Sequence, residues 1–293
     1  MKVTVVGLGL IGGSIALTLR DSGFADHVIG VDKDINHCEE ALALGLINEV
    51  LPLEEAVKEA DLIILAIPVD AAANLIAHVL DHIKEGAIVT DMGSTKSNIC
   101  SKARQHPRRG RFVAAHPIAG TENTGPEAAF NSLFQGKVSI ICEQDASDED
   151  ALACVEEMYS HAKMNLVYMT AAEHDKHLAY VSHLSHITSF TLGLTVLEVE
   201  KSENNIFNLA GSGFASTARL AKSSPDMWAP IFKENKDQLL NVLDEYMHQL
   251  QDFRQHIAQE NDEALKVMMH RANDIRRIIP SPMPATLDKT KII

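Results

Sequence analysis

Cysteine is scarce in this sequence. The 293 residues include four cysteines and no CxxC pair, a density far too low for a small fold held by disulfides. The first residues, MKVTVVG, reach a glycine before the apolar segment of a signal peptide could form. These observations predict free thiols in a cytoplasmic protein. The cysteines are Cys38, Cys100, Cys142 and Cys154.

Basic side chains are outnumbered. The chain has 26 Lys and Arg against 40 Asp and Glu, which gives a formal charge of −14 and a pI near 5.4. Non-specific binding to nucleic acid depends on clustered positive charge, so we exclude DNA and RNA as expected partners. Apolar residues make up 46% of the sequence, enough for a substantial core, and this composition excludes general disorder.

One stretch imitates a membrane-spanning helix. Residues 178–197 contain no Asp, Glu, Lys or Arg. The same 20 residues include His183, His186, three Ser and three Thr, all of which are costly to bury in hydrocarbon. We therefore predict a helix inside a protein domain and no membrane partner.

The first part of the chain alternates between short apolar runs and helical patterns. This alternation predicts an α/β domain over residues 1–170, with a mainly parallel sheet covered on both faces. Residues 171–279 contain only helix-forming segments, which predicts an all-α region, and the proline-rich residues 280–293 predict a loose tail. The expected strands are 3–6, 28–31, 62–67, 87–90, 112–115, 138–142 and 166–169.

A glycine motif links the first predicted strand to the first predicted helix. In GLGLIG, Gly7 permits a tight turn, Gly9 allows the backbone to approach a pyrophosphate, and Gly12 allows close packing of helix and strand. Asp32 follows at the end of the second strand, where its carboxylate would bind an adenosine ribose. We predict a Rossmann-type dinucleotide site and favour NAD over NADP, although Lys33 weakens that choice. The alternative for Asp32 is a solvated acid. The expected cofactor-binding residues are Gly7, Gly9, Leu10, Ile11, Gly12 and Asp32.

Two candidate catalytic residues follow later strands. Ser94 lies after the strand at 87–90, and His116 ends the strand at 112–115 and precedes a proline. Open α/β sheets bind ligands at the carboxyl ends of their strands. His116 could act as a general base toward an alcohol, and Ser94 could hydrogen-bond the same hydroxyl. A purely structural role for His116 is equally compatible with the pattern.

Several motifs together resemble the prephenate dehydrogenase family, which includes arogenate dehydrogenases. They are GLGLIGGS at 7–14, DMGSTK at 91–96, AHPIAGTE at 115–122, VSHLSH at 181–186 and ASTARLAKSSPDMW at 215–228. The resemblance implies NAD-dependent oxidative decarboxylation of prephenate to 4-hydroxyphenylpyruvate in tyrosine biosynthesis, or the corresponding reaction of arogenate. It also implies a homodimer, and tyrosine is a candidate feedback inhibitor.

The resemblance also implies roles for individual residues. His116 matches the catalytic base and Ser94 its hydrogen-bonding partner. Arg219 matches an arginine that holds a substrate carboxylate, and Glu122 matches a residue that gates the site. The remaining implied substrate-binding residues are Thr121, Ser182, His186 and Trp228.

Helical spacing gives two further expectations. At 100° per residue, one stripe of the helix after residue 171 gathers small and polar side chains, which favours a wet cleft. His174, His177 and His183 then point to other sides, which argues against a metal site. A second, apolar stripe near the end of the chain predicts a homodimer contact. The first stripe is Asp175, Ala179, Ser182, His186 and Ser189; the second is Leu239, Leu243, Tyr246, Leu250, Phe253 and Ile257, widened by Leu240 and Met247.

Two other functions stay open at this point. A β-hydroxyacid dehydrogenase has a catalytic Lys with an Asn four residues later, but here Tyr180 stands at that spacing from Lys176. An NAD-sensing module without chemistry would not need both Ser94 and His116.

Overall fold

An eight-stranded sheet forms the centre of the first part of the chain. The computed structural model describes residues 1–203 and 206–278. The strand order is β3-β2-β1-β4-β5-β6-β7-β8, and neighbouring strands pair in parallel except β6 and β7, which are antiparallel. The strands are β1 (Lys2–Val6), β2 (His27–Val31), β3 (Glu49–Val50), β4 (Leu62–Leu65), β5 (Ile88–Asp91), β6 (Phe112–Pro117), β7 (Val138–Cys142) and β8 (Asn165–Met169).

The predicted mainly parallel sheet is confirmed, and seven of its strands lie where apolar runs predict them. Strand β3 was not predicted, because it has two residues, both half-buried, and gives no apolar run.

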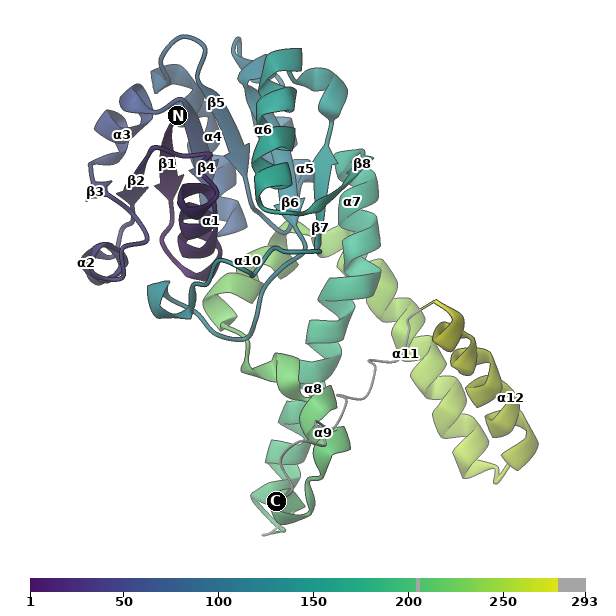
Figure 1. Ribbon diagram of the computed structural model, residues 1–293. Coiled ribbons are helices and arrows are strands. Elements are labelled where there is room, and N and C mark those ends of the chain that lie inside the picture. Colours follow the sequence, from purple (N-terminus) through teal and green to yellow (C-terminus); the bar gives the residue numbers. More distant parts are fainter. Residues whose placement is uncertain (204–205, 279–293) are drawn as a thin grey trace, which may run out of the picture. The chain divides into compact units, whose positions relative to one another are not determined.

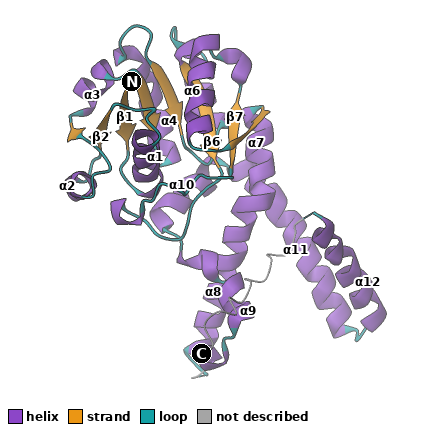
Figure 2. Ribbon diagram, in the orientation of Figure 1, coloured by secondary structure: helices purple, strands orange, loops and turns teal. Residues whose placement is uncertain are grey.

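Helices cover both faces of this sheet (Figures 1 and 2). Strand β4, with the sequence LIIL, contributes to the core on both faces. Leu62 and Ile64 lie in one core cluster, and Ile63 and Leu65 lie in the other. Burial on both faces removes the polar alternation of a half-exposed strand. The covering helices are α1 (Leu10–Asp21), α2 (Ile35–Ala43), α3 (Leu53–Glu59), α4 (Val69–His82), α5 (Ser97–Ala103) and α6 (Glu149–His161).

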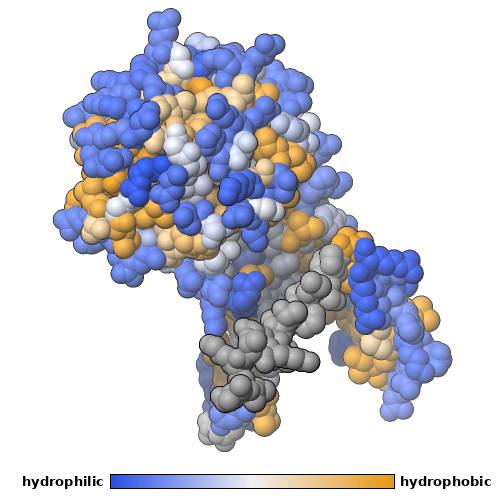
Figure 3. All heavy atoms as spheres, in the orientation of Figure 1, coloured by the Kyte–Doolittle hydropathy of each residue, from blue (hydrophilic) through white to orange (hydrophobic). Residues whose placement is uncertain are grey.

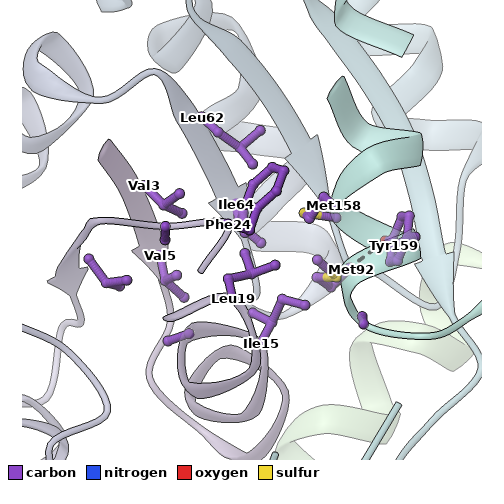
Figure 4. Packing of buried hydrophobic residues seen from close by; sticks show 14 of the residues in the cluster. Val3, Val5, Ile15, Leu19, Phe24, Leu62, Ile64, Met92, Met158 and Tyr159 are labelled. Atoms are coloured by element: carbon purple, nitrogen blue, oxygen red, sulfur yellow. Dashed lines mark hydrogen bonds between the residues drawn. The ribbon is translucent and has the colours of Figure 1, made fainter. Parts of the chain in front are cut away.

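Helix α1 shows how the larger cluster is packed. Its side chains Ile15 and Leu19 lie against Val3 and Val5 of β1 (Figure 4). All four are fully buried, and each buried aliphatic side chain contributes about 1.5–3 kcal/mol. This packing fixes the start of α1, and with it the glycine turn, against the carboxyl end of β1.

Every regular element described after β8 is helical, which confirms the predicted all-α region. The chain forms two compact units, Met1–Leu240 and Asn241–Ile293, so the first unit includes helices as well as the sheet. The predicted tail at 280–293 lies outside the described residues. The elements are α7 (Ala171–Leu178), the π-helical turn η4 (Ala179–His183), α8 (Leu184–Glu200), the 3-10 turn η5 (Ile206–Leu209), α9 (Ser212–Thr217), the 3-10 turn η6 (Arg219–Lys222), α10 (Pro225–Glu234), α11 (Lys236–Ala258), α12 (Asp262–Ala272) and the 3-10 turn η7 (Asn273–Arg277).

Helix α7 begins at a strong sequence signal. The Thr170 side chain accepts a hydrogen bond from the Glu173 N–H, and the Glu173 side chain accepts one from the Thr170 N–H. Such a capping box satisfies donors that the first turn leaves free. The Glu143 carboxylate at the end of β7 accepts from the next free donor, the Ala171 N–H, at 2.9 Å. Three side chains thus fix where α7 starts relative to the sheet.

Apolar surface is concentrated in the later helices. Only Ser189 is buried along α8, although that helix is rich in apolar residues. In α11 and α12, exposed apolar side chains lie among polar ones (Figure 3). Within residues 1–203 and 206–278, no helix is both long and apolar enough to span a bilayer.

Candidate active site

The glycine turn between β1 and α1 has the backbone geometry that its sequence predicts. Gly7 has φ +97°, and its N–H donates to the Val31 carbonyl at 2.7 Å. A Cβ on Gly7 would lie 2.5 Å from the Ala66 carbonyl oxygen, and one on Gly12 would lie 1.8 Å from that of Gly7. Side chains are therefore excluded at both positions, for reasons of conformation and of space.

The middle of this turn is open. A Cβ built on Gly9 would meet no atom of the described residues within 4 Å, so a ligand can approach the backbone there. Gly9 is also the N-cap of α1, and Leu10 and Ile11 are its first two residues. Free N–H groups at a helix start favour a phosphate. The turn fits the pyrophosphate of a dinucleotide.

Asp32 directly follows β2, and its side chain binds the backbone of the glycine turn. Its carboxylate accepts hydrogen bonds from the N–H groups of Leu8 at 2.7 Å and Asp34 at 2.9 Å. The side chain is 10% exposed. A freely solvated acid would be neither so buried nor so well bonded, and an acid held here would meet a ribose next to the pyrophosphate.

A buried row of polar groups begins at His116, near the end of β6. His116 Nδ1 lies 2.8 Å from His174 Nε2, and His174 Nδ1 lies 2.8 Å from Asp175 Oδ1. These three side chains are at most 8% exposed. The row joins the sheet to α7, since His116 belongs to a strand and the other two residues to the helix.

The far end of this row is fixed by backbone donors. The Asp175 carboxylate accepts from the Lys96 N–H and the Ser97 N–H, each at 2.8 Å. The Lys96 ammonium forms a fully buried ion pair with Asp91, and Asp91 also accepts from the Ala115 N–H at 3.2 Å, one residue before His116. The segment after β5 therefore holds both His116 and its partners in place.

Burial sets the charge of the histidines in this region. It lowers the pKa of His116 well below the ordinary 6.5, and nearby His174 and Lys96 lower it further. Burial likewise lowers the pKa of His174 and lowers that of His183 to about 4. Desolvation disfavours the charged imidazolium, so these side chains are neutral at pH 7.

An aromatic group, formed by His183, His186 and Trp228, lies beside the buried row that begins at His116. His186 stacks on Trp228 with ring centroids 3.5 Å apart, and His183 meets the same indole edge-on at 5.9 Å. Trp228 is 6% exposed, and its indole nitrogen lacks a partner among the described residues. His183 also contributes to lowering the pKa of His116, which places the aromatic group beside the buried row.

The outer part of the site is a charged pair. Arg219, in η6, donates to Glu122 at 3.2 Å, and the two side chains are 53% and 33% exposed. Arg219 also contributes to lowering the pKa of His186, after burial. The His186 Nδ1–H in turn donates to the Ser182 carbonyl at 3.1 Å.

The predicted site residues all lie within Met1–Leu240, where contacts join Arg219 to Glu122 and His186 to Ser182 and Trp228. Ser94 is half-buried in the turn after β5, two residues before Lys96. Thr121 and Glu122 lie in the segment after β6, where the Thr121 hydroxyl accepts from the Asn123 N–H at 3.2 Å. His116 and Trp228 are buried, and His186 is half-buried.

The helical repeat predicts the wrong directions for His174 and His183. It placed them on other sides of the helix, but both are fully buried at the site. For His183 and later residues the cause is the π-helical turn η4, which inserts a residue into the helical repeat. His174 precedes that turn and reaches the site through its contact with His116 of β6. Among residues 1–203 and 206–278, no group of three or more His, Cys, Asp or Glu side chains is placed to hold a metal ion.

Other residues of the site were missed. Asn235 is buried, donates to the Asp175 main-chain carbonyl at 2.7 Å and lies 3.1 Å from His183 Nδ1. No sequence pattern around Asn235 predicts these contacts. Asp91 and Lys96 stand in the DMGSTK motif, and charged residues at a strand end were a signal that could have found them.

Comparisons with known proteins identify both parts of the chain. Residues 15–168 match the family model for the prephenate dehydrogenase nucleotide-binding domain, and residues 170–271 match that for the prephenate dehydrogenase dimerization domain. The description of the second domain supports the predicted homodimer.

Individual relatives agree with these matches. A prephenate dehydrogenase of Bacillus subtilis is 33% identical over 288 residues, which cover 96% of this chain and 77% of that protein. A cyclohexadienyl dehydrogenase of Zymomonas mobilis is 32% identical over 90% of both chains. The crystal structure of Aquifex aeolicus prephenate dehydrogenase with hydroxyphenyl propionate and NAD+ has a TM-score of 0.84 at 30% identity, and the match covers 95% of this chain and 98% of that one. The chain therefore belongs to the prephenate dehydrogenase family of NAD-dependent oxidoreductases.

Proposed function

We propose that this protein catalyses the NAD-dependent oxidative decarboxylation of prephenate to 4-hydroxyphenylpyruvate. The observation that carries the proposal is a buried His116 at the same edge of the sheet as an open glycine turn. Burial lowers the pKa of His116 well below 6.5, which favours its neutral form. A neutral imidazole can take a proton from an alcohol. The dinucleotide that fits the glycine turn supplies a hydride acceptor when bound.

The residues around His116 divide the remaining tasks. His116 accepts the proton of the ring hydroxyl, and Ser94 hydrogen-bonds the same oxygen. Arg219 binds a substrate carboxylate through charge-assisted hydrogen bonds. Loss of the ring carboxylate as CO2 makes the product aromatic, so the protein needs mainly to position and polarise the substrate.

The outer residues admit and orient the substrate. Glu122 is paired with Arg219, so a substrate carboxylate must displace it, and in that sense Glu122 gates the site. Thr121, Ser182 and His186 contact the substrate. Trp228 holds the His186 ring in place, because the two rings are stacked.

Arogenate is the second candidate substrate. It differs from prephenate by an amino group in place of a keto group, remote from the reacting carbon. A structure named arogenate dehydrogenase, from Synechocystis, covers 95% of this chain with a TM-score of 0.74 at 28% identity. That likeness keeps the alternative open.

Asp32 supports NAD over NADP. Its carboxylate is held at the end of β2 by two N–H groups, where it would bind a ribose hydroxyl and repel a 2′-phosphate. We expect Asp32→Asn, which keeps the shape, to shift the ratio of catalytic efficiencies toward NADP. A wild-type enzyme that already prefers NADP would contradict this role.

We also propose that the chain consists of two domains that meet near residue 170. The matches at 15–168 and 170–271 support a division of the chain near residue 170. We propose that tyrosine, which resembles the product, inhibits by binding the same site. A cytoplasmic location stays a prediction from the composition.

Initial rates of NADH and NADPH formation test the proposed function. They should be measured with prephenate and with arogenate, each with NAD and with NADP. We expect the highest kcat/KM for prephenate with NAD, and an aromatic product with release of CO2. Turnover of arogenate alone would replace the proposal by the second candidate, and no turnover of either would refute both.

A further inference from the structure

The hydrogen bonds of the buried row determine where its protons lie. The Asp175 carboxylate accepts from two backbone N–H groups, and its own hydrogen bonds lower its pKa although burial opposes this. Asp175 is therefore ionised and can only accept. The contact at 2.8 Å then requires His174 to donate from Nδ1.

The proton position on His174 determines the proton position on His116. A neutral His174 that carries its proton on Nδ1 has a lone pair on Nε2. His116 Nδ1, 2.8 Å away, must donate to that lone pair. The proton of neutral His116 thus stays on Nδ1, and its Nε2 carries the free lone pair.

We infer that His174 and Asp175 are positioning residues that hold His116 in the tautomer whose Nε2 can accept the substrate proton. This inference rests on the proposed function of His116 as the base. In the other tautomer, Nε2 would present an N–H to the hydroxyl and could not accept its proton. During the reaction the hydroxyl proton moves to Nε2, the Nδ1 proton stays in place, and the row stabilises the imidazolium that forms.

The surroundings keep this row in one arrangement. The capping box at Thr170 and the Glu143 carboxylate fix the start of α7. On the other side, the Asn235 amide donates to the Asp175 main-chain carbonyl at 2.7 Å. The two side chains that hold His116 are therefore fixed from the sheet and from the start of α11.

The charged groups that face the row agree with this assignment. The charged groups are the Lys96 ammonium, which is paired with Asp91, and the Asp175 carboxylate; the imidazole of His183, which also faces the row, is neutral at pH 7. Lys96 lowers the pKa values of both His116 and His174. A positive charge on either imidazole is thus disfavoured in the resting protein, as the proton positions require.

Nuclear magnetic resonance reads the tautomers directly and without turnover. In protein labelled with 15N histidine, long-range 1H–15N spectra distinguish a proton on Nδ1 from one on Nε2. We expect the Nδ1–H tautomer for both His116 and His174 at pH 7 to 8. A proton on Nε2 of His116 would overturn the inference. The measurement does not depend on prephenate, so it separates this inference from the proposed function.

Two substitutions of His174 separate positioning from general structure. His174→Gln places an amide oxygen near the position of Nε2 and can still accept from His116. His174→Asn reaches only the position of Nδ1 and leaves His116 without its acceptor. We expect His174→Asn to lower kcat by about 10²-fold or more and His174→Gln by less than about tenfold, with the KM for NAD unchanged in both.

The matched control is His177→Asn, because His177 lies on the same helix and is exposed. It should leave kcat unchanged. The spectra of His116 should show Nε2–H in His174→Asn and Nδ1–H in His174→Gln. Equal losses of kcat in the two variants, with an unchanged His116 tautomer, would refute the positioning role. If His174→Asn fails to fold, the wild-type spectra and His174→Gln still decide the question.

Discussion

The two ends of the candidate site solve different physical problems. At the inner end, His116, His174 and Asp175 are at most 8% exposed and are bonded to one another. At the outer end, Arg219 and Glu122 are 53% and 33% exposed. Electrostatic interactions are strong in a desolvated interior and weak beside water. The inner end can therefore tune a proton acceptor, while the outer end can exchange partners at little cost.

The largest effect should come from the inner end. His116→Asn keeps a similar size but cannot accept the proton, so we expect kcat to fall by about 10²–10⁴-fold, with little change in NAD affinity. Wild-type kcat should rise with pH as His116 loses its proton, at a pH below its ordinary pKa of 6.5. The variant should lose this limb of the profile.

Ser94→Ala is the companion variant. It removes one hydrogen bond and leaves the proton acceptor in place, so its loss of kcat should be smaller and its pH limb retained. A His116→Asn enzyme with near-normal kcat and the same limb would mean that another group takes the proton. His186 would then be the next candidate.

How far the sequence predicts this site depends on the range over which its residues interact. His116 and Ser94 are found because parallel strands bring their carboxyl ends to one edge, so a polar residue after an apolar run is already placed. The row from His116 to His174 spans 58 residues and two elements. Nothing local to either residue indicates that contact. For His183 and the residues after it, the π-helical turn that follows α7 also makes the ideal helical repeat misleading.

The fold shows the same limit. Strand β4 is a continuous run of buried apolar side chains and is easy to recognise, because both faces of the sheet are covered. Strand β3 exists only because its two residues pair with Ile29 and Gly30 of β2. Its signal lies in the partner strand, so a short edge strand of this kind is missed.

The second prediction concerns stability in acid, where the inner end should dominate. The pKa of His183 is about 4 in the folded protein against 6.5 ordinarily. The unfolded chain therefore binds more protons between these values, and the free energy of unfolding should fall as pH decreases through that window. The loss amounts to about 3 kcal/mol for His183 alone, and the lowered pKa values of His116 and His174 add to it.

Urea unfolding at several pH values and one protein concentration measures this loss. The variant His183→Gln should lose less stability between pH 6.5 and 4 than the wild type does, because its side chain takes up no proton. His177→Gln, at an exposed position of α7, should follow the wild-type curve. An unfolding free energy of the wild type that does not change over this window would show that the buried imidazoles are not held neutral.

The third prediction concerns substrate binding by Arg219 at the outer end of the site. Arg219→Ala removes charge-assisted hydrogen bonds to the substrate, each worth about 1.5–3 kcal/mol. We expect the KM for prephenate to rise roughly 10- to 100-fold, while kcat changes less and the KM for NAD stays the same. Lys222→Ala removes an exposed positive charge from the same turn and should change little. Equal effects of the two variants would mean that the KM for prephenate depends on the net positive charge of this turn and not on a specific contact with Arg219.

The smallest effect should come from Glu122→Gln. Its ion pair with Arg219 is exposed on both sides, and such pairs contribute about 0–1 kcal/mol to stability, so the unfolding free energy should hardly change. Since the substitution removes a carboxylate that competes for Arg219, the KM for prephenate should fall, by less than about fivefold. This gain should shrink as salt screens the wild-type pair. Rates at low and high ionic strength would measure it. If Glu122→Gln instead lowered kcat as much as His116→Asn does, the two ends of the site could not be acting separately.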